Sequence, residues 1–178
     1  MRAFIAIEMP ENVKQELTKI QKEIDKLALI KGKFTEFENL HLTLKFLGEI
    51  SRSELEAVKE RLGSIKFDPF EAELGELGVF SEDFIRIVWI GLNGKEMFEI
   101  QKQVDKMLED IFPPENRFMA HVTLARPKFV EDKQVFINEL KKISFEKMKF
   151  KVDNISLKES ELTKQGAKYS DLLMVRGM

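Results

Sequence analysis

The chain contains 178 residues, 43% of them hydrophobic and 34% charged, a composition typical of folded globular proteins and unlike that of disordered or membrane-embedded chains. It has no cysteine, which excludes disulfides, a thiolate nucleophile and a Cys-ligated zinc site. With 29 basic and 31 acidic residues, it lacks the basic excess of proteins that hold long nucleic acids through many phosphates. Any nucleic-acid partner should therefore be a short stretch or an end.

The first predicted element is a short strand from Ala3 to Ile7. Its apolar run is followed closely by Pro10 and a charged segment, so it is too short for the core of a signal peptide or for a membrane span. Together with the absence of cysteine, this predicts a cytoplasmic protein that has no membrane partner.

The rest of the first half is predicted to alternate helices and strands. A helix follows Pro10, because apolar residues recur every three or four positions from Val13 to Leu27. The strand HLTLKF, residues 41–46, comes next. Ser51 to Glu54 have a capping-box pattern, which opens a second helix, and a β stretch around Phe70 to Phe80 ends this half.

The same order of elements begins again in the second half. The predicted elements are a strand from Ile85 to Leu92, a helix with Ile100, Val104, Met107 or Leu108, and Ile111 facing inward, the strand HVTLAR (121–126), a helix near Asp132 to Ile143, and strands near Lys149 to Leu157 and Leu172 to Val175. Pro113 and Pro114 end the first of these helices. The repeated order predicts one α+β domain over residues 1–178, made of two intertwined pseudo-repeats at about 1–80 and 84–178.

Both histidines of the chain lie in the same sequence context, His–apolar–Thr–Leu. Threonine occupies five of 178 positions, so two chance occurrences of Thr two residues after His have a probability of roughly one in a thousand. In a strand, residues i and i+2 point to the same face. His41 and Thr43 therefore project together, as do His121 and Thr123, while the apolar residues between them point to the core.

If the two halves pack about a pseudo-two-fold axis, these pairs face one another across a cleft. One histidine can then act as general base and the other as general acid. The threonine hydroxyls can donate hydrogen bonds to oxygens on which negative charge develops. This arrangement predicts transfer at a phosphodiester.

Two alternatives have to be weighed against this prediction. A single histidine on a half-buried strand is more often structural, and threonine favours strands in any case, but the repetition at both histidines favours chemistry. A metal site is disfavoured, because two histidines are too few ligands and neither motif has a carboxylate at a suitable spacing. We therefore expect no metal and no other cofactor.

HLTLKFLGE and HVTLAR resemble the paired signature of the two-histidine (2H) phosphoesterase superfamily. FIAIEMP, ENLHLTLKFLGE, RFMAHVTLARPK and LKESELTKQGAKYSDL resemble, in order, segments of its RNA 2′,3′-cyclic phosphodiesterase family, historically called 2′-5′ RNA ligase (LigT-like). The resemblance implies a bilobal α+β fold, each lobe an antiparallel sheet with helices on its outer face, and an active site in the cleft between the lobes. It also implies hydrolysis of an RNA-terminal 2′,3′-cyclic phosphate to a 2′-phosphate without a cofactor.

The resemblance assigns His41 and His121 as the catalytic pair and Thr43 and Thr123 as phosphate-binding residues. Arg126, five residues after the second histidine, matches a phosphate-contacting position of the family. Strict alternation would place Arg126 on the face opposite His121, and we expect Pro127 to end the strand there and let the backbone turn.

Aromatic residues are candidates to stack on an RNA base. Phe4 and Tyr169 are the two that we retain. Phe46 is expected to point to the core by alternation, and Lys45, although on the face of His41, is expected to be a solvated surface lysine.

RNA ends, such as those of tRNA or tRNA halves, are the expected partners of a monomeric enzyme. Reversible 2′-5′ RNA ligation is an expected side activity, in which a 5′-hydroxyl replaces water. The alternatives are a 2H enzyme that hydrolyses 2′-5′ linkages or small cyclic nucleotides, and a non-catalytic protein that binds RNA ends.

Overall fold

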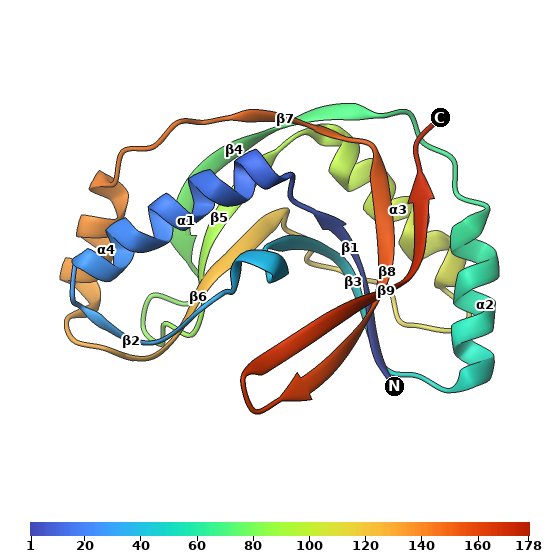
Figure 1. Ribbon diagram of the computed structural model, residues 1–178, viewed down its shortest axis with the longest axis horizontal. Coiled ribbons are helices and arrows are strands. Elements are labelled where there is room, and N and C mark those ends of the chain that lie inside the picture. The colour runs from blue at the N-terminus through green and yellow to red at the C-terminus, as the bar shows by residue number, and fades with distance from the viewer.

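In the computed structural model, which describes all residues 1–178, nine antiparallel strands form one curled sheet (Figure 1). The strands are β1 (Arg2–Glu8), β2 (Ile30–Phe34), β3 (His41–Glu49), β4 (Phe70–Val79), β5 (Val88–Asn93), β6 (His121–Val130), β7 (Lys149–Val152), β8 (Asn154–Thr163) and β9 (Gly166–Arg176). The helices are α1 (Glu11–Lys26), α2 (Arg52–Gly63), α3 (Lys95–Leu108), α4 (Lys133–Lys142) and the short 3-10 helix η1 (Phe37–Asn39). Figure 1 shows α1 and α4 toward one end of the molecule and α2 and α3 toward the other.

The strand order has a centre, which is the contact between β3 and β6. The order is β7-β4-β5-β6-β3-β1-β8-β9, and β2 pairs with the outer part of β6. On either side of the centre, β5 corresponds to β1, β4 to β8 and β7 to β9. The predicted duplicated α+β fold is therefore confirmed, although the two half-sheets join into one. The repeat boundaries at about 1–80 and 84–178 remain a prediction.

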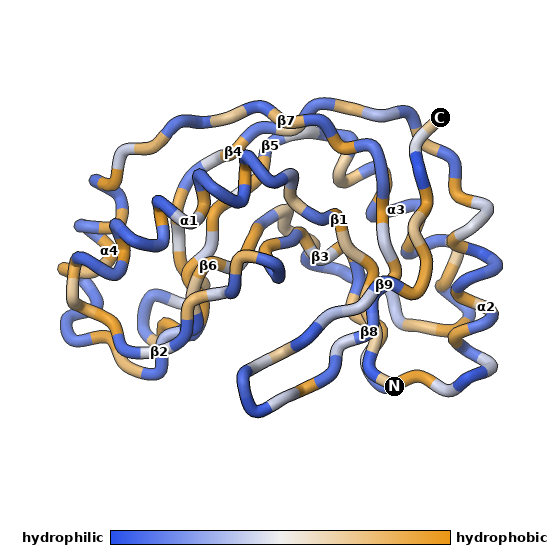
Figure 2. The backbone as a smooth tube through the Cα atoms, viewed as in Figure 1, coloured by the Kyte–Doolittle hydropathy of each residue, from blue (hydrophilic) through white to orange (hydrophobic).

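Local sequence signals explain most elements. On α1, Val13, Leu17, Ile20 and Ile24 are all buried, as their spacing predicts. Figure 2 shows hydrophobic and hydrophilic positions alternating along this helix. The predicted capping box of α2 is present: Ser51 Oγ accepts a hydrogen bond from the Glu54 amide at 3.2 Å, and the Ser51 amide donates to Glu54 Oε2 at 2.7 Å.

Some predicted boundaries were wrong. Strand β2 was not predicted, because only its two end residues are apolar and the middle reads Lys-Gly-Lys. The predicted strand at Lys149 to Leu157 is divided between β7 and β8. β8 and β9 form a hairpin that is longer than the apolar pattern indicates and that projects from the sheet (Figure 1). Ile111 lies beyond the end of α3 at Leu108.

Both central strands contain a β-bulge at the same place in the motif. In β3, Thr43 pairs with Ala6 and Lys45 with Ile5, so Leu44 is the extra residue. In β6, Thr123 pairs with Trp89 and Ala125 with Val88, so Leu124 is the extra residue. Two consecutive side chains are buried at each bulge, Leu44 with Lys45 and Leu124 with Ala125. Each bulge therefore reverses the alternation of faces in the residues that follow it, as far as the next register shift, which is at Leu47 in β3 and at Lys128 in β6.

Candidate active site

The two His–x–Thr motifs meet at the centre of the sheet. Leu42 of β3 pairs with Val122 of β6, and both side chains are fully buried. The flanking His41, Thr43, His121 and Thr123 are only partly buried and project from the opposite face. Because the strands are antiparallel, this pairing places each histidine beside the threonine of the other motif.

Backbone carbonyl groups fix the orientation of both imidazoles. The Nδ1 atom of His41 lies 2.6 Å from the Asn39 carbonyl oxygen, and that of His121 lies 2.7 Å from the Met119 carbonyl oxygen. A carbonyl can only accept, so Nδ1 carries the proton in both neutral rings and Nε2 has the free lone pair. Nε2 of His41 lies 2.9 Å from Thr43 Oγ1, which donates to it in this tautomer. Both histidines are thus prepared to accept a proton at Nε2.

An aromatic ring packs edge-on against each histidine. The Tyr169 ring is 5.4 Å from that of His41 at 90°, and the Phe80 ring is 5.1 Å from that of His121 at 89°. Phe4 packs against His41 at 5.0 Å but is only 3% exposed. The prediction that Phe4 stacks on a base is therefore wrong, because the ring supports His41 from within the sheet. Tyr169 remains partly exposed beside His41.

Burial lowers the pKa of both histidines below the usual 6.5. The pKa of His41 falls to about 4, chiefly because of desolvation; the Asn39 carbonyl raises it, and Lys158 lowers it by charge repulsion. Desolvation also lowers the pKa of His121, with a raising contribution from the Met119 carbonyl and a lowering one from Arg126. Both imidazoles are therefore neutral in the free protein at pH 7.

The bulges move two residues onto the histidine face. Arg126 and Phe46 both stand five residues after a histidine, and both are exposed, whereas their neighbours Ala125 and Lys45 are buried. Arg126 is therefore on the face of His121, but not for the predicted reason: β6 continues past Pro127 to Val130, and the bulge at Leu124 makes the change. The expectation that Phe46 points to the core was wrong, since it is 65% exposed.

Lys45 is not the solvated lysine that was expected. Its side chain is 4% exposed, and Nζ donates to Asp105 Oδ1 at 2.5 Å and to the Pro113 carbonyl oxygen at 2.7 Å. The bulge at Leu44 turns Lys45 away from the histidine face and toward α3. It therefore anchors the segment that leads from α3 to His121 and does not reach the histidine face.

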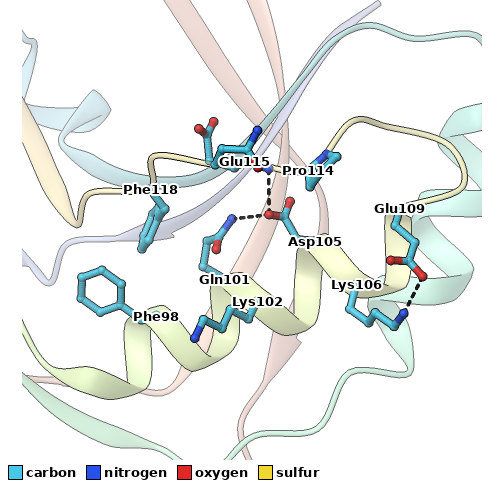
Figure 3. A pocket seen from close by; sticks show the side chains of 10 residues that line it. Phe98, Gln101, Lys102, Asp105, Lys106, Glu109, Pro114, Glu115 and Phe118 are labelled. Atoms are coloured by element: carbon cyan, nitrogen blue, oxygen red, sulfur yellow. Dashed lines mark hydrogen bonds and ion pairs between the residues drawn. The ribbon is translucent and has the colours of Figure 1, made fainter.

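Asp105 is also one of the residues that line a surface pocket of about 410 Å³ beside α3 (Figure 3). Asp105 Oδ2 accepts hydrogen bonds from Gln101 Nε2 at 2.9 Å and from the Glu115 amide at 2.8 Å. None of the residues that line this pocket belongs to the motif strands or to their partner strands. Its polar contacts hold the loop after α3, so we assign it a structural role.

Sequence reasoning missed a charged network on the His41 side. Glu8 is the cross-strand partner of His41. It pairs with Lys14 at 2.8 Å and with Lys158 at 3.5 Å, and Lys158 also pairs with Asp171 at 2.6 Å. Alternation along β1 could have placed Glu8 on the face of Phe4, but nothing in the sequence indicates that β8 brings Lys158 there. Glu8, Lys158 and Asp171 also border a pocket of about 660 Å³ beside the β8–β9 hairpin.

The His121 side is built differently. The cross-strand partner of His121 is Gly91, and that of Thr123 is Trp89. The indole packs over Gly78, where an added Cβ would lie 2.5 Å from the ring. The two histidines therefore have similar backbones and different neighbours, one charged and one aromatic. No group of three or more His, Asp or Glu side chains is arranged to hold a metal ion, and no helix has both the length and the hydropathy to cross a membrane.

Comparison with known families gives two consecutive matches to one model. The model, described as LigT like Phosphoesterase, matches residues 7–89 and 90–169. An RNA 2′,3′-cyclic phosphodiesterase of Methanocaldococcus jannaschii is 33% identical over 174 residues, which cover 95% of this chain and 96% of that protein. A protein of the same name from Aeropyrum pernix is 39% identical over 150 residues, which cover 81% of this chain and 85% of that protein.

Solved structures have the same overall fold. The crystal structure of TT0787 from Thermus thermophilus has a TM-score of 0.82 at 25% identity, covering 99% of this chain and 97% of that one. The structure of E. coli LigT complexed with 3′-AMP has a TM-score of 0.77 at 22% identity, covering 98% of this chain and 96% of that one. At that identity the second likeness shows the fold alone.

Proposed function

Because the chain belongs to the LigT-like phosphoesterase family, we propose that it hydrolyses RNA-terminal 2′,3′-cyclic phosphates to 2′-phosphates. The observation that carries the proposal is the meeting of two His–x–Thr pairs on one face, at the Leu42–Val122 contact between β3 and β6. Relatives at 33% and 39% identity are named RNA 2′,3′-cyclic phosphodiesterase, which supports the choice of substrate.

The reaction needs one base and one acid on opposite sides of phosphorus. In our proposal His121 accepts a proton from water through Nε2 as the water oxygen attacks phosphorus. The P–O3′ bond breaks in line with this attack, and His41, protonated when the anionic phosphate is bound, gives its proton to the 3′-oxygen. A 2′-phosphate remains. The reaction consumes one water and requires no energy source.

Three side chains are suited to bind the phosphate oxygens. The hydroxyl groups of Thr43 and Thr123 lie beside the histidines, and Arg126 is on the same face without an ion-pair partner. Hydrogen bonds from such groups strengthen as charge develops on the non-bridging oxygens. At the other end of the site, the exposed ring of Phe46 replaces Phe4 as the candidate to stack on the terminal base, and Tyr169 stays a candidate beside His41.

The test is a turnover assay with an RNA that ends in a 2′,3′-cyclic phosphate, in the presence of EDTA, with the product identified by phosphorus NMR. We expect turnover and a single product, the 2′-phosphate, because one histidine on each side of phosphorus allows only one in-line alignment. A 3′-phosphate, or a mixture of both isomers, would contradict the assignment of acid and base. Binding without turnover would favour a protein that only holds RNA ends.

We propose reversible 2′-5′ ligation as a side activity of the same site. A 5′-hydroxyl can take the place of the attacking water, with His121 again as base and His41 as acid. In cleavage of a 2′-5′ linkage the roles would be exchanged, with His41 as the base and His121 as the acid. Product analysis on matched cyclic and 2′-5′-linked substrates separates the three activities.

A further inference from the structure

The paired segments of β2 and β6 that surround Arg126 are unusually rich in basic residues. Residues 30–34 and 125–130 read IKGKF and ARPKFV, with four cations and no acid. In a chain of net charge −2, this is a local concentration of positive charge. Lys33 pairs with Glu36 at 2.6 Å, whereas Lys31 and Lys128 form no ion pair. Beside them Phe129 is 55% exposed, although it lies within a strand.

The strand register places Lys31, Lys33 and Phe129 on the histidine face. Lys33 pairs with Arg126 and Lys31 with Phe129, and directly paired residues share a face. Gly32, on the other face, packs so closely on β6 that an added Cβ would lie 2.4 Å from the Arg126 carbonyl oxygen. β6 has a second bulge here, in which Lys128 is the extra residue between the partners of Gly32 and Lys31; its side chain is exposed. We call Lys31, Lys128 and Phe129 the outer strip.

The outer strip and Phe46 lie on opposite sides of the phosphate site. β3 and β6 are antiparallel at Leu42 and Val122, so the residues that follow His41 and those that follow His121 extend in opposite directions. At about 3.3 Å per residue, Phe129 lies within about 10 Å of Arg126 along β6. A phosphate held between the histidines therefore has Phe46 on one side and the outer strip on the other.

We propose that the outer strip binds a second RNA strand, the one that carries the 5′-oxygen joined to the phosphate in a 2′-5′ linkage. The proposal rests on the proposed function of the site. Two lysines without ion pairs and an exposed aromatic ring match the phosphates and bases of single-stranded RNA. The strand must extend from the side of attack, which is the His121 side, and the outer strip continues the strand that carries His121.

The reaction that joins or cleaves the two RNA strands neither consumes nor releases water. In joining, His121 takes the proton of the 5′-hydroxyl, whose oxygen bonds to phosphorus as the P–O3′ bond breaks, and His41 protonates the 3′-oxygen. In cleavage the same steps run backwards and return a 2′,3′-cyclic phosphate and a free 5′-hydroxyl. One P–O bond replaces another in either direction.

The experiment compares two substrates that differ in the second strand. One is 2′,3′-cyclic AMP, which has no second strand, and the other is an adenosine joined by a 2′-5′ linkage to the trinucleotide ApApA. We expect Phe129→Ala to lower kcat/KM on the linked substrate by about 5- to 150-fold, the range for loss of one base–aromatic stack, and to change hydrolysis of cyclic AMP by less than about twofold. Lys31→Ala with Lys128→Ala should make cleavage of the linked substrate less dependent on salt.

Phe98→Ala and Lys102→Ala, which remove similar side chains from the α3 pocket of Figure 3, are the matched controls and should behave as wild type. If the outer-strip variants cleave the linked substrate as well as wild type does, the strip does not bind RNA and the proposal is wrong. If wild type hydrolyses cyclic AMP but leaves the linked substrate intact, the proposal that the outer strip binds a second RNA strand is wrong, whereas the proposed function stands. Inactivity on both cyclic AMP and cyclic-phosphate RNA would remove the proposed function itself.

Discussion

At the scale of single residues, the imidazoles of His41 and His121 have equivalent hydrogen bonds at Nδ1 and different surroundings. Glu8 and Lys158 lie near His41, whereas Trp89 and Phe80 lie near His121. The sequence motif could identify the pair, because the pattern repeats within four letters. It could not distinguish their roles, because the neighbours come from other strands.

Replacing either histidine by alanine should lower kcat by about 10²- to 10⁴-fold, the usual contribution of a positioned acid or base. The two can be separated with a substrate whose leaving 3′-oxygen is replaced by sulfur, which departs without being protonated. On this substrate His41→Ala should recover most of its activity, and His121→Ala should not. Recovery of His121→Ala instead would reverse the two roles.

The pH dependence of activity should reflect the lowered pKa values. The proposed mechanism requires one neutral and one protonated imidazole in the free enzyme, and burial lowers both pKa values below 6.5. We therefore expect the maximum of kcat/KM to lie below pH 6.5. A bound phosphodiester anion raises both pKa values, so the kcat profile should lie at higher pH. Lys158→Met should move the kcat/KM profile toward pH 6.5, because repulsion from Lys158 is removed; coincident profiles would contradict this account.

At the scale of elements, the β-bulges account for the errors in the predicted faces. Alternation correctly predicted which face of the sheet carries His41, Thr43, His121 and Thr123, because these residues precede the bulges. It failed from Lys45 onward, since a bulge adds one residue without any signal in a single sequence. Arg126 was retained because of the family resemblance, and the bulge supplies the physical reason that strand parity lacked.

Lys45 tests this description of β3. Lys45→Ala should lower the free energy of unfolding by about 3–5 kcal/mol, because it leaves Asp105 and the Pro113 carbonyl oxygen without their buried partner. Denaturant unfolding measures the change. The control is Lys106→Ala, which removes an exposed pair with Glu109 and should cost no more than about 1 kcal/mol. A loss at Lys45 no larger than at Lys106 would contradict the burial of this lysine.

At the scale of the whole molecule, the buried neutral histidine links folding to pH. In the unfolded chain His41 has a pKa near 6.5, and in the folded protein about 4. Between these values the unfolded state binds more protons, so the free energy of unfolding should fall as the pH falls from 6.5 toward 4. The lowered pKa values of Glu8 and Asp105 act in the same sense, but only below about pH 4.5.

Denaturant unfolding at pH 7, 6 and 5 isolates this contribution. We expect wild type to lose stability over this range, and His41→Asn to lose distinctly less, because asparagine does not titrate. Parallel curves for the two proteins would show that His41 is not buried in its neutral form.

The order of elements made the duplicated fold predictable, whereas strand β2 and the long β8–β9 hairpin had to be seen in the structure. The middle of β2 and the turn of the hairpin are largely polar, and residues far away in the chain hold that turn: Lys33 donates to the Gln165 carbonyl oxygen, and Asn39 Nδ2 to that of Ala167. Long-range contacts of this kind leave no periodic pattern in a sequence.

β3 and β6 pair through one residue pair only, Leu42 with Val122, so the two halves of the sheet are joined at its centre by a very short ladder. All other ladder contacts of β3 are with β1, whereas β6 pairs elsewhere with β2 and β5. The two imidazoles thus lie on strands that share a single residue pair, so a phosphate bound between them, as proposed, would span the junction of the two half-sheets. We therefore expect a change of side-chain volume at Leu42 or Val122, which are fully buried, to change the distance between the imidazoles of His41 and His121 without altering either ring.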